Sequence, residues 1–258
     1  MYKNHNLEGC HAVITGAAKG IGAAIADRLD AEGASITLMG RTQETLDLKV
    51  KTLNRAQAQQ VDVTSEDSVI QAFSMATKQL GPVDILINNA GAALSVPLHR
   101  TDTKDWQYML DVNLSGTFYC CREVTPAMRD NNWGRIVNIA SIAGLSGAAY
   151  ISAYCAAKHG VIGLTRALAM ELATKGITVN ALCPGYTNTE LLDGALNNIM
   201  AKTGLSQAEA ETQLKSSNPQ NRFIEPEEVA ASVAWLCLPG SEGVNGQSVP
   251  ITGGGSQA

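Results

Sequence analysis

The most informative part of this sequence for the fold is His11-Ala-Val-Ile-Thr15-Gly16-Ala-Ala-Lys19-Gly20-Ile21-Gly22. An apolar run ends at Thr15, three glycines follow, and a helical pattern begins beyond them. Glycines at a strand-to-helix turn let the backbone approach a phosphate closely, and the free N–H groups of the helix N-terminus favour an anion. The spacing is G-x-x-x-G-x-G, which differs from the G-x-G-x-x-G dinucleotide fingerprint. The stretch therefore predicts a phosphate-binding turn, with a glycine-rich turn that binds nothing as the alternative.

Short apolar runs alternate with amphipathic helical patterns along the whole chain. The expected strands are His11–Thr15, Ser35–Met39, Gln59–Val63, Val83–Asn88, Arg135–Ala140, Thr178–Cys183 and Ser248–Ile251. The clearest helical patterns are Ile21–Glu32, Glu66–Gln79 and Pro226–Leu238. Nearly continuous apolar strands are typical of a sheet that is buried on both faces. The alternation predicts an α/β fold of the doubly wound, Rossmann type, with a parallel sheet of about seven strands and helices on both faces.

Composition excludes several classes of function. The formal net charge of −5 gives no electrostatic basis for binding nucleic acid or an anionic membrane surface. No apolar stretch is long enough to span a bilayer, and residues 1–10 are polar, so we expect a cytoplasmic protein. The six cysteines form no C-x-x-C pair and the four histidines are scattered, so we expect buried thiols and no metal site.

One segment interrupts the strand–helix alternation. Residues 186–225 contain two helical patterns, near Glu190–Lys202 and Ser206–Lys215, and no strand candidate. The segment follows a buried strand, at the sheet edge where ligands of such folds bind. We therefore expect residues 1–258 to form a single dinucleotide-binding and catalytic domain in which residues 186–225 are a substrate-covering lid. An ordinary insertion is the alternative.

The residues after the second strand favour one cofactor. A site for NAD usually has an acidic residue roughly twenty positions after the glycine turn, which binds the ribose hydroxyls. Residues 34–40 contain no acid, and Arg41 follows them. An arginine there suits the 2′-phosphate of NADP, and Lys19 adds a second positive charge. The sequence favours NADP(H) over NAD(H).

Three residues in the second half of the chain suggest the chemistry. Tyr154 and Lys158 are four residues apart in a helical pattern, so they share one face. A nearby ammonium is expected to lower the phenol pKa from about 10, toward the range that acid–base catalysis needs. Ser141 ends a strand, where its hydroxyl can donate a hydrogen bond to a carbonyl oxygen.

Together these motifs resemble the short-chain dehydrogenase/reductase family over essentially the whole length, and its 3-oxoacyl-thioester reductases in particular. The matching positions, in chain order, are Thr15 to Gly22, Asp62-Val63, Asn88 to Gly91, Asn113, Ser141, Tyr154, Lys158, Pro184-Gly185, and Thr187 or Thr189. The resemblance implies an oxidoreductase that transfers a hydride between NADP(H) and a carbonyl or secondary alcohol.

The resemblance also implies a role for each matching residue. Tyr154 is expected to be the general acid in reduction, Lys158 to bind the nicotinamide ribose, Ser141 to orient the carbonyl, and Asn113 to hold a water in a proton relay. The expected cofactor contacts are Gly16, Lys19, Gly20, Ile21, Gly22, Arg41, Asp62, Val63, Asn89, Ala90, Gly91, Tyr154, Lys158, Pro184, Gly185, Thr187 and Thr189.

The substrate is expected to bind between Ser141, Tyr154 and the lid. The candidate wall is mostly apolar and comprises Ala143, Leu145, Ser146, Tyr150, Tyr186, Leu191, Leu192 and Leu196. It predicts a small-molecule ketone that is apolar beside the carbonyl, such as a 3-oxoacyl compound. An NAD-dependent 3-hydroxyacyl or hydroxybutyrate dehydrogenase is one alternative, and an NADP-binding regulatory protein without catalysis is another.

The resemblance further implies a homotetramer. Its helices around Trp106–Met128 and Tyr154–Thr174 would pack across one two-fold axis. Val161, Leu164, Leu168 and Leu172 form an apolar face that suits this interface, although an intramolecular core explains them equally well.

Overall fold

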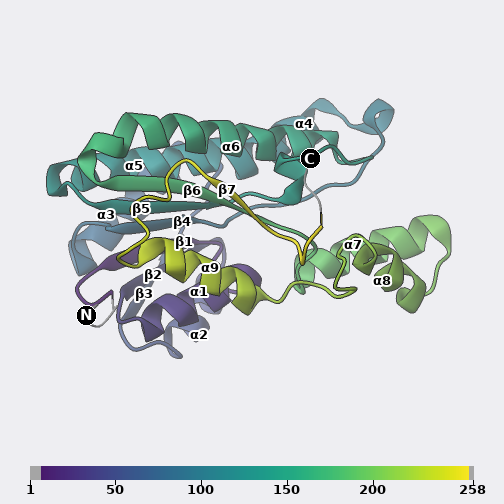
Figure 1. Cartoon of the computed structure of the whole chain (residues 1–258). Helices are drawn as coiled ribbons and strands as arrows, with labels where there is room; N and C mark the ends of the chain where they lie inside the picture. The colour runs from purple at the N-terminus through teal and green to yellow at the C-terminus, as the bar shows by residue number, and fades with distance from the viewer. Residues whose placement is uncertain (1–6, 256–258) are drawn as a thin grey trace.

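The computed structural model describes residues 7–255 and contains one seven-stranded sheet, in which every strand pair is parallel (Figure 1). The strand order is β3-β2-β1-β4-β5-β6-β7. The strands are β1 His11–Thr15, β2 Ser35–Gly40, β3 Ala56–Gln60, β4 Ile85–Asn88, β5 Gly134–Ile139, β6 Ile177–Pro184 and β7 Ser248–Ile251. This is the predicted doubly wound α/β fold.

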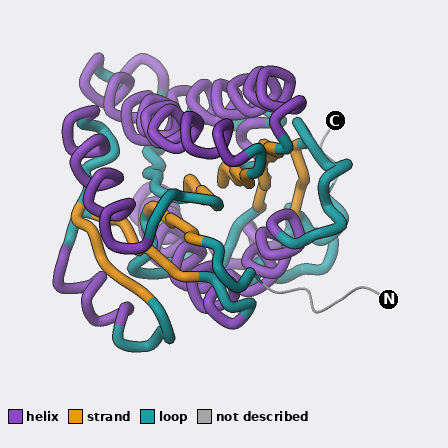
Figure 2. The backbone as a smooth tube through the Cα atoms, turned by 90° about the vertical axis from the view of Figure 1, so that its left-hand side faces the viewer, coloured by secondary structure: helices purple, strands orange, loops and turns teal. Residues whose placement is uncertain are grey.

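Helices cover the sheet in two layers, as Figure 2 shows from the side. One layer consists of α1 (Gly20–Ala31), α2 (Gln43–Val50) and α9 (Pro226–Cys237). The other consists of α3 (Glu66–Leu80), α4 (Thr103–Leu110), α5 (Gly116–Asn131) and α6 (Ser152–Leu172). Within residues 7–255, no helix combines the length and apolar character that crossing a membrane requires.

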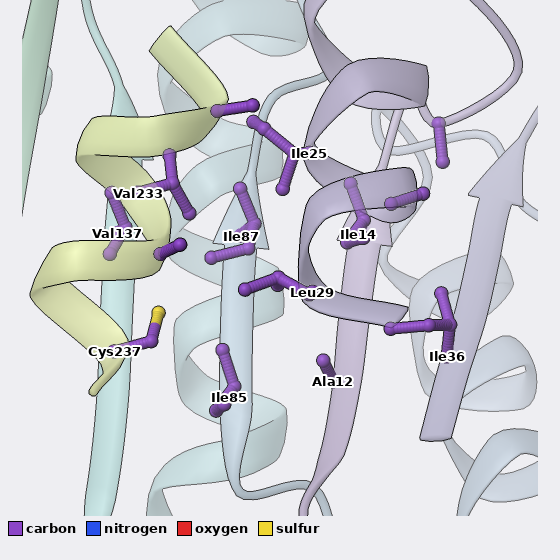
Figure 3. Packing of buried hydrophobic residues seen from close by; sticks show 14 of the residues in the cluster. Ala12, Ile14, Ile25, Leu29, Ile36, Ile85, Ile87, Val137, Val233 and Cys237 are labelled. Carbon is purple, nitrogen blue, oxygen red and sulfur yellow. The ribbon is translucent and has the colours of Figure 1, made fainter. Parts of the chain in front are cut away.

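The alternation of side chains along each strand divides the core between the two layers. Ala12 and Ile14 of β1 pack with Ile25 and Leu29 of α1, as Figure 3 shows. Val13, between them, belongs to the cluster on the opposite face. Burial on both faces explains why Ala12, Val13 and Ile14 are all apolar.

The topology has a switch point between β1 and β4, where a ligand crevice is expected. The chain winds outward from β1 to β3 on one side and from β4 to β7 on the other. Loops at the carboxyl ends of β1 and β4 therefore leave in opposite directions, and ligands of open α/β sheets bind in the crevice between such loops.

The third strand differs from its prediction. It runs from Ala56 to Gln60 and not from Gln59 to Val63. β3 is an edge strand with half-exposed residues, so it lacks the apolar signal of the central strands. Val61 and Val63 are buried, but they lie in the turn that leads to α3. Their apolar character indicates packing beneath a helix and not strand structure.

The helical region around residue 113 also departs from a regular helix. A π-helical turn, Asp111–Ser115, separates α4 from α5. Such turns are rare and occur frequently at functional sites. This turn contains Asn113, which is almost fully buried at 1% exposure.

The segment of residues 186–225 forms α7 (Glu190–Thr203) and α8 (Gln207–Lys215), which project from one end of the sheet (Figure 1). The two helices pack on each other through their own apolar cluster. The segment leaves and returns through a short parallel bridge between Thr187 and Ile224. Its two ends are thus fixed beside β6, at the same edge as the glycine turn.

Candidate active site

The glycine turn has the backbone geometry that a phosphate cradle needs. Gly16 and Gly20 adopt φ angles of +64° and +54°, which strain residues that carry a Cβ. A Cβ at Gly22 would lie 2.3 Å from the Gly16 carbonyl oxygen and 2.6 Å from Asn89 Nδ2. Lys19 is the N-cap of α1, and its side chain makes no capping hydrogen bond. The turn therefore brings the backbone and the N-terminus of α1 to the β1–β4 crevice.

Asn89 joins the glycine turn to the end of β4. Its Nδ2 donates to the carbonyl oxygens of Thr15 and Gly16, both at 3.0 Å. The Thr15 hydroxyl in turn accepts from the backbone N–H groups of Asn89 and Ala90, also at 3.0 Å. These four hydrogen bonds fix the two walls of the crevice relative to each other. Thr15 was counted among the matching positions from the sequence, but no role in the site was predicted for it.

The expected adenosine contacts lie at the same sheet edge. Arg41 is exposed directly after β2, and its carbonyl accepts from Gln60 Nε2 at 2.8 Å. Asp62 accepts from the backbone N–H and the hydroxyl of Thr64, at 3.0 and 2.7 Å. Val63 beside it is buried. These contacts leave the Arg41 guanidinium in solvent and stabilise the turn after β3.

Lys19 forms an ion pair that the sequence did not predict. Its Nζ contacts the carboxylate of Glu190, the first residue of α7. Both side chains are largely exposed, and exposed pairs contribute about 0–1 kcal/mol. A phosphate could therefore compete for the Lys19 ammonium at little cost.

Ser141, Tyr154 and Lys158 converge at the carboxyl end of β5. Ser141 follows β5 and accepts a hydrogen bond from the Ala143 backbone N–H at 3.1 Å. The Ser141 side chain is also hydrogen-bonded to Tyr154, on the first turns of α6. One turn later, Lys158 Nζ lies 5.6 Å from the Tyr154 ring centroid and donates to the Ile139 carbonyl at 2.8 Å.

Burial controls the ionisation of this group. Lys158 is 5% exposed, and its burial lowers the pKa of the ammonium to about 8. Burial also raises the pKa of Tyr154 to about 12, while the hydrogen bond with Ser141 opposes the shift. This direction is opposite to the one expected from the sequence, because desolvation by burial is the largest influence on the phenol. At neutral pH the pair is therefore a protonated phenol beside a cationic lysine.

Asn113 is held beneath this group by the π-helical turn. Its Nδ2 donates to the carbonyls of Ala92 and Met109 at 2.9 and 3.0 Å, and its Oδ1 accepts from the Ala92 N–H at 3.3 Å. A Cβ at Gly91 would lie 2.8 Å from Asn113 Oδ1 and 3.7 Å from Lys158 Nζ. The loop after β4 therefore packs directly against Asn113, and a side chain at Gly91 would reach Lys158.

The residues after β6 close the crevice from the other side. Pro184 ends β6, and the N–H of Gly185 donates to Ile251 at 3.0 Å. Thr187 is buried, and its hydroxyl donates to the Gly185 carbonyl at 3.0 Å. Thr189 is the N-cap of α7, and a Cβ at Gly20 would lie 3.1 Å from its methyl group. Thr189 thus faces the glycine turn, whereas Thr187 braces the loop.

The expected substrate wall is only partly exposed. Tyr150, Tyr186 and Leu191 are 63%, 41% and 53% exposed. Leu192 and Leu196 instead pack into the apolar cluster between α7 and α8. Ala143 is buried, Leu145 is half-buried, and Ser146 is exposed. An apolar residue on an amphipathic helix can face a partner helix or a substrate, and the sequence pattern does not separate the two.

Comparison with known proteins agrees with this geometry. The family model described as short chain dehydrogenase matches residues 10–198. The chain is 36% identical to the D-beta-hydroxybutyrate dehydrogenase of Rhizobium meliloti over 254 residues, covering 94% of this chain and 97% of that protein. It is 33% identical to the 3-oxoacyl-acyl-carrier-protein reductase FabG of Vibrio cholerae over 250 residues, covering 96% and 98%. A crystal structure of an actinorhodin polyketide ketoreductase variant with NADPH superposes with a TM-score of 0.92 at 36% identity, covering 95% of this chain and 96% of that chain.

The chain therefore belongs to the short chain dehydrogenase family. The family assignment made from the motifs is confirmed, and with it the class of enzyme, an oxidoreductase acting on CH–OH or C=O groups.

The contacts of Gly22 generate a prediction about the glycine turn. Gly22→Ala should destabilise the protein by about 1–3 kcal/mol, because the added methyl group overlaps the Gly16 carbonyl and the Asn89 amide. For a chain of this size that is a fall in Tm of roughly 2–12 °C in thermal unfolding.

Gly194→Ala is the matched control, because Gly194 also lies within a helix but nothing is within 4 Å of its added Cβ. It should leave Tm unchanged or raise it slightly. If both variants raised Tm equally, the close packing at Gly22 would be refuted.

Proposed function

We propose that this protein is an NADP(H)-dependent reductase of ketones that are apolar beside the carbonyl, with 3-oxoacyl compounds as the favoured class. The observation that carries the proposal is the convergence of Ser141, Tyr154 and Lys158 beside the glycine turn. The relatives named as 3-oxoacyl and polyketide reductases support the substrate class.

The residues of the crevice fit a dinucleotide. Positive φ angles at Gly16 and Gly20 and the absence of a Cβ at Gly22 open the turn for a pyrophosphate beside the N-terminus of α1. Asn89 and Gly91 would line the groove, and Lys158 and Thr189 would bind the nicotinamide end. The bound nicotinamide would supply the hydride.

The protein side chains would supply the proton and the alignment. Ketone reduction adds a hydride to the carbonyl carbon and a proton to its oxygen. Tyr154, with its pKa raised to about 12, keeps its proton at neutral pH and can donate it. Ser141 would donate a hydrogen bond to the same oxygen, and the Lys158 ammonium would stabilise the phenolate as it forms.

The preference for NADP(H) rests on charge. Arg41 places a solvated guanidinium after β2, and Lys19 lies in the glycine turn, so two cations can reach a 2′-phosphate. The related ketoreductase crystallised with NADPH supports the same preference. An NAD-dependent secondary-alcohol dehydrogenase is the second candidate, favoured by the hydroxybutyrate dehydrogenase relative.

We also propose that the protein forms a homotetramer. Val161 and Leu172, expected at an interface, are buried within the subunit at 1% and 0% exposure, whereas Leu164 and Leu168 are half-buried. Other apolar side chains of these helices face solvent, namely Trp106, Phe118 and Met170. A groove of about 540 Å³ lies between α5 and α6.

A cytoplasmic location remains a prediction.

The catalytic role of Tyr154 predicts the outcome of removing its hydroxyl. Tyr154→Phe should lower kcat at least about 100-fold, because the proton donor is lost, and should leave the Kd for NADPH within about two-fold. Turnover is measured with NADPH and a panel of β-keto thioesters, aryl ketones, steroids and sugars.

The panel also distinguishes an enzyme from a regulatory protein that binds NADP(H). A wild type that binds NADPH but reduces no member of the panel would favour the regulatory protein.

The cofactor preference predicts the effect of Arg41→Ala. The variant should raise KM for NADPH about ten-fold or more, because charge-assisted hydrogen bonds to the 2′-phosphate are lost, and should leave KM for NADH nearly unchanged. Arg55→Ala is the control, because Arg55 is also exposed but precedes β3, at the opposite edge of the sheet. A wild type that used NADH as efficiently as NADPH would overturn the assignment.

The proposed assembly predicts that a charge on its apolar face lowers the mass in solution. Met170→Glu should convert tetramers into smaller species in light scattering, because Met170 is an apolar side chain that is 85% exposed on α6. Leu48→Glu, on α2 of the opposite layer, should leave the mass unchanged. A monomeric wild type would refute the tetramer.

A further inference from the structure

A row of buried polar side chains crosses the sheet beneath the proposed active site. Asn88 of β4, Asn138 of β5 and Thr165 of α6 are 4%, 0% and 0% exposed. Asn88 Nδ2 donates to Asn138 Oδ1 at 2.8 Å, and Asn138 Nδ2 donates to the Thr165 hydroxyl at 2.9 Å. The row therefore connects the strand of the cofactor loop to the helix that carries Tyr154 and Lys158.

The row has a single direction. The Thr165 hydroxyl donates to the Val161 carbonyl at 2.8 Å, so it accepts from Asn138. Asn138 then accepts from Asn88, whose amide also donates to Cys121 Sγ at 3.3 Å. Asn88 Oδ1 has no partner among residues 7–255. Apolar side chains in place of this row would leave no unpaired buried oxygen. The presence of the polar row therefore indicates a role in fixing the position of α6 relative to the strands.

The row complements the contact made by Lys158. Asn138 adjoins Ile139, whose carbonyl accepts from Lys158 Nζ at 2.8 Å. Thr165 is seven residues after Lys158, which is two helical turns along the same face. α6 is therefore hydrogen-bonded to β5 at two points along its axis. The hydrophobic effect behind the surrounding apolar contacts is non-directional, whereas these two hydrogen bonds each require a particular placement of donor and acceptor.

We propose that Asn138 and Thr165 are positioning residues, which set the axial position and rotation of α6 on β5 and thereby hold Lys158 and Tyr154 at Ser141. The proposal rests on the proposed function for its catalytic consequence. Its structural part, the anchoring of α6, is independent of any substrate.

The test compares Thr165→Val with Thr165→Ser. Valine keeps the shape of threonine and removes the hydroxyl, which leaves the Asn138 amide without its acceptor. Thr165→Val should lower kcat about ten-fold, because small displacements of reacting groups are costly, while KM for NADPH and ketone stays within about two-fold. Thr165→Ser retains the hydroxyl and should recover most of the wild-type kcat.

The pH profile separates positioning from a loss of stability. Ketone reduction by the wild type should fall as pH rises through about 8, where the buried Lys158 loses its proton. If α6 shifts and Lys158 becomes better solvated, its pKa moves back toward 10.5. The alkaline limb of Thr165→Val should therefore lie at higher pH than that of the wild type and of Thr165→Ser.

Hydrogen exchange of the cofactor-free protein gives a readout that needs no activity. Thr165→Val should speed amide exchange in α6. Thr125→Val on α5 is the control and should leave exchange in α6 unchanged, although the Thr125 hydroxyl also donates to the carbonyl four residues earlier, that of Cys121. The proposal would be overturned if Thr165→Val left exchange in α6 unchanged, or left both kcat and the alkaline limb unchanged. A Thr165→Ser variant with kcat as low as that of Thr165→Val would also overturn it. If the wild type reduced no ketone, only the proposed function would fail, because the exchange comparison still decides the anchoring.

Discussion

The structure depends on the joint between the ends of β1 and β4. Four hydrogen bonds cross it, from Asn89 and Ala90 to Thr15 and Gly16, each contributing about 1 kcal/mol net. The Asn89 side-chain amide leaves no room for a side chain at Gly22. The contacts of Asn89 therefore hold the ends of β1 and β4 together and also require glycine at position 22.

Burial connects this joint to the chemistry. The loop after β4 is hydrogen-bonded to Asn113 through Ala92, and Lys158 beside it is buried, at 5% exposure. A buried ammonium needs acceptors, and the Ile139 carbonyl provides one at 2.8 Å. Desolvation of Lys158 lowers the pKa of its ammonium to about 8. The ammonium lies 5.6 Å from the centroid of the Tyr154 ring. The strands, the loop after β4 and α6 thus together position the side chains that we propose transfer the proton.

The sequence predicted the fold well where burial is two-sided. The continuous apolar runs of β1 and β6 identified their strands, and the Tyr154–Lys158 spacing placed both on one helix face. The prediction of β3 was wrong because β3 is a half-exposed edge strand without an apolar pattern. The predicted direction of the Tyr154 pKa shift was wrong because it depends on desolvation, which the spacing of residues does not encode. Leu192 and Leu196 were expected to face the substrate, but they pack between α7 and α8. The sequence of an amphipathic helix does not reveal which neighbour its apolar face contacts.

The proposed reaction is direct hydride transfer from a nicotinamide to a carbonyl carbon held at Ser141 and Tyr154. It can be followed by isotope transfer from NADPH deuterated at C4 to a 3-oxoacyl thioester. With the label on the transferred face, we expect one deuterium on the new carbinol carbon of the product, detected by mass spectrometry. A reduced product that carries no deuterium with either face labelled would contradict direct transfer.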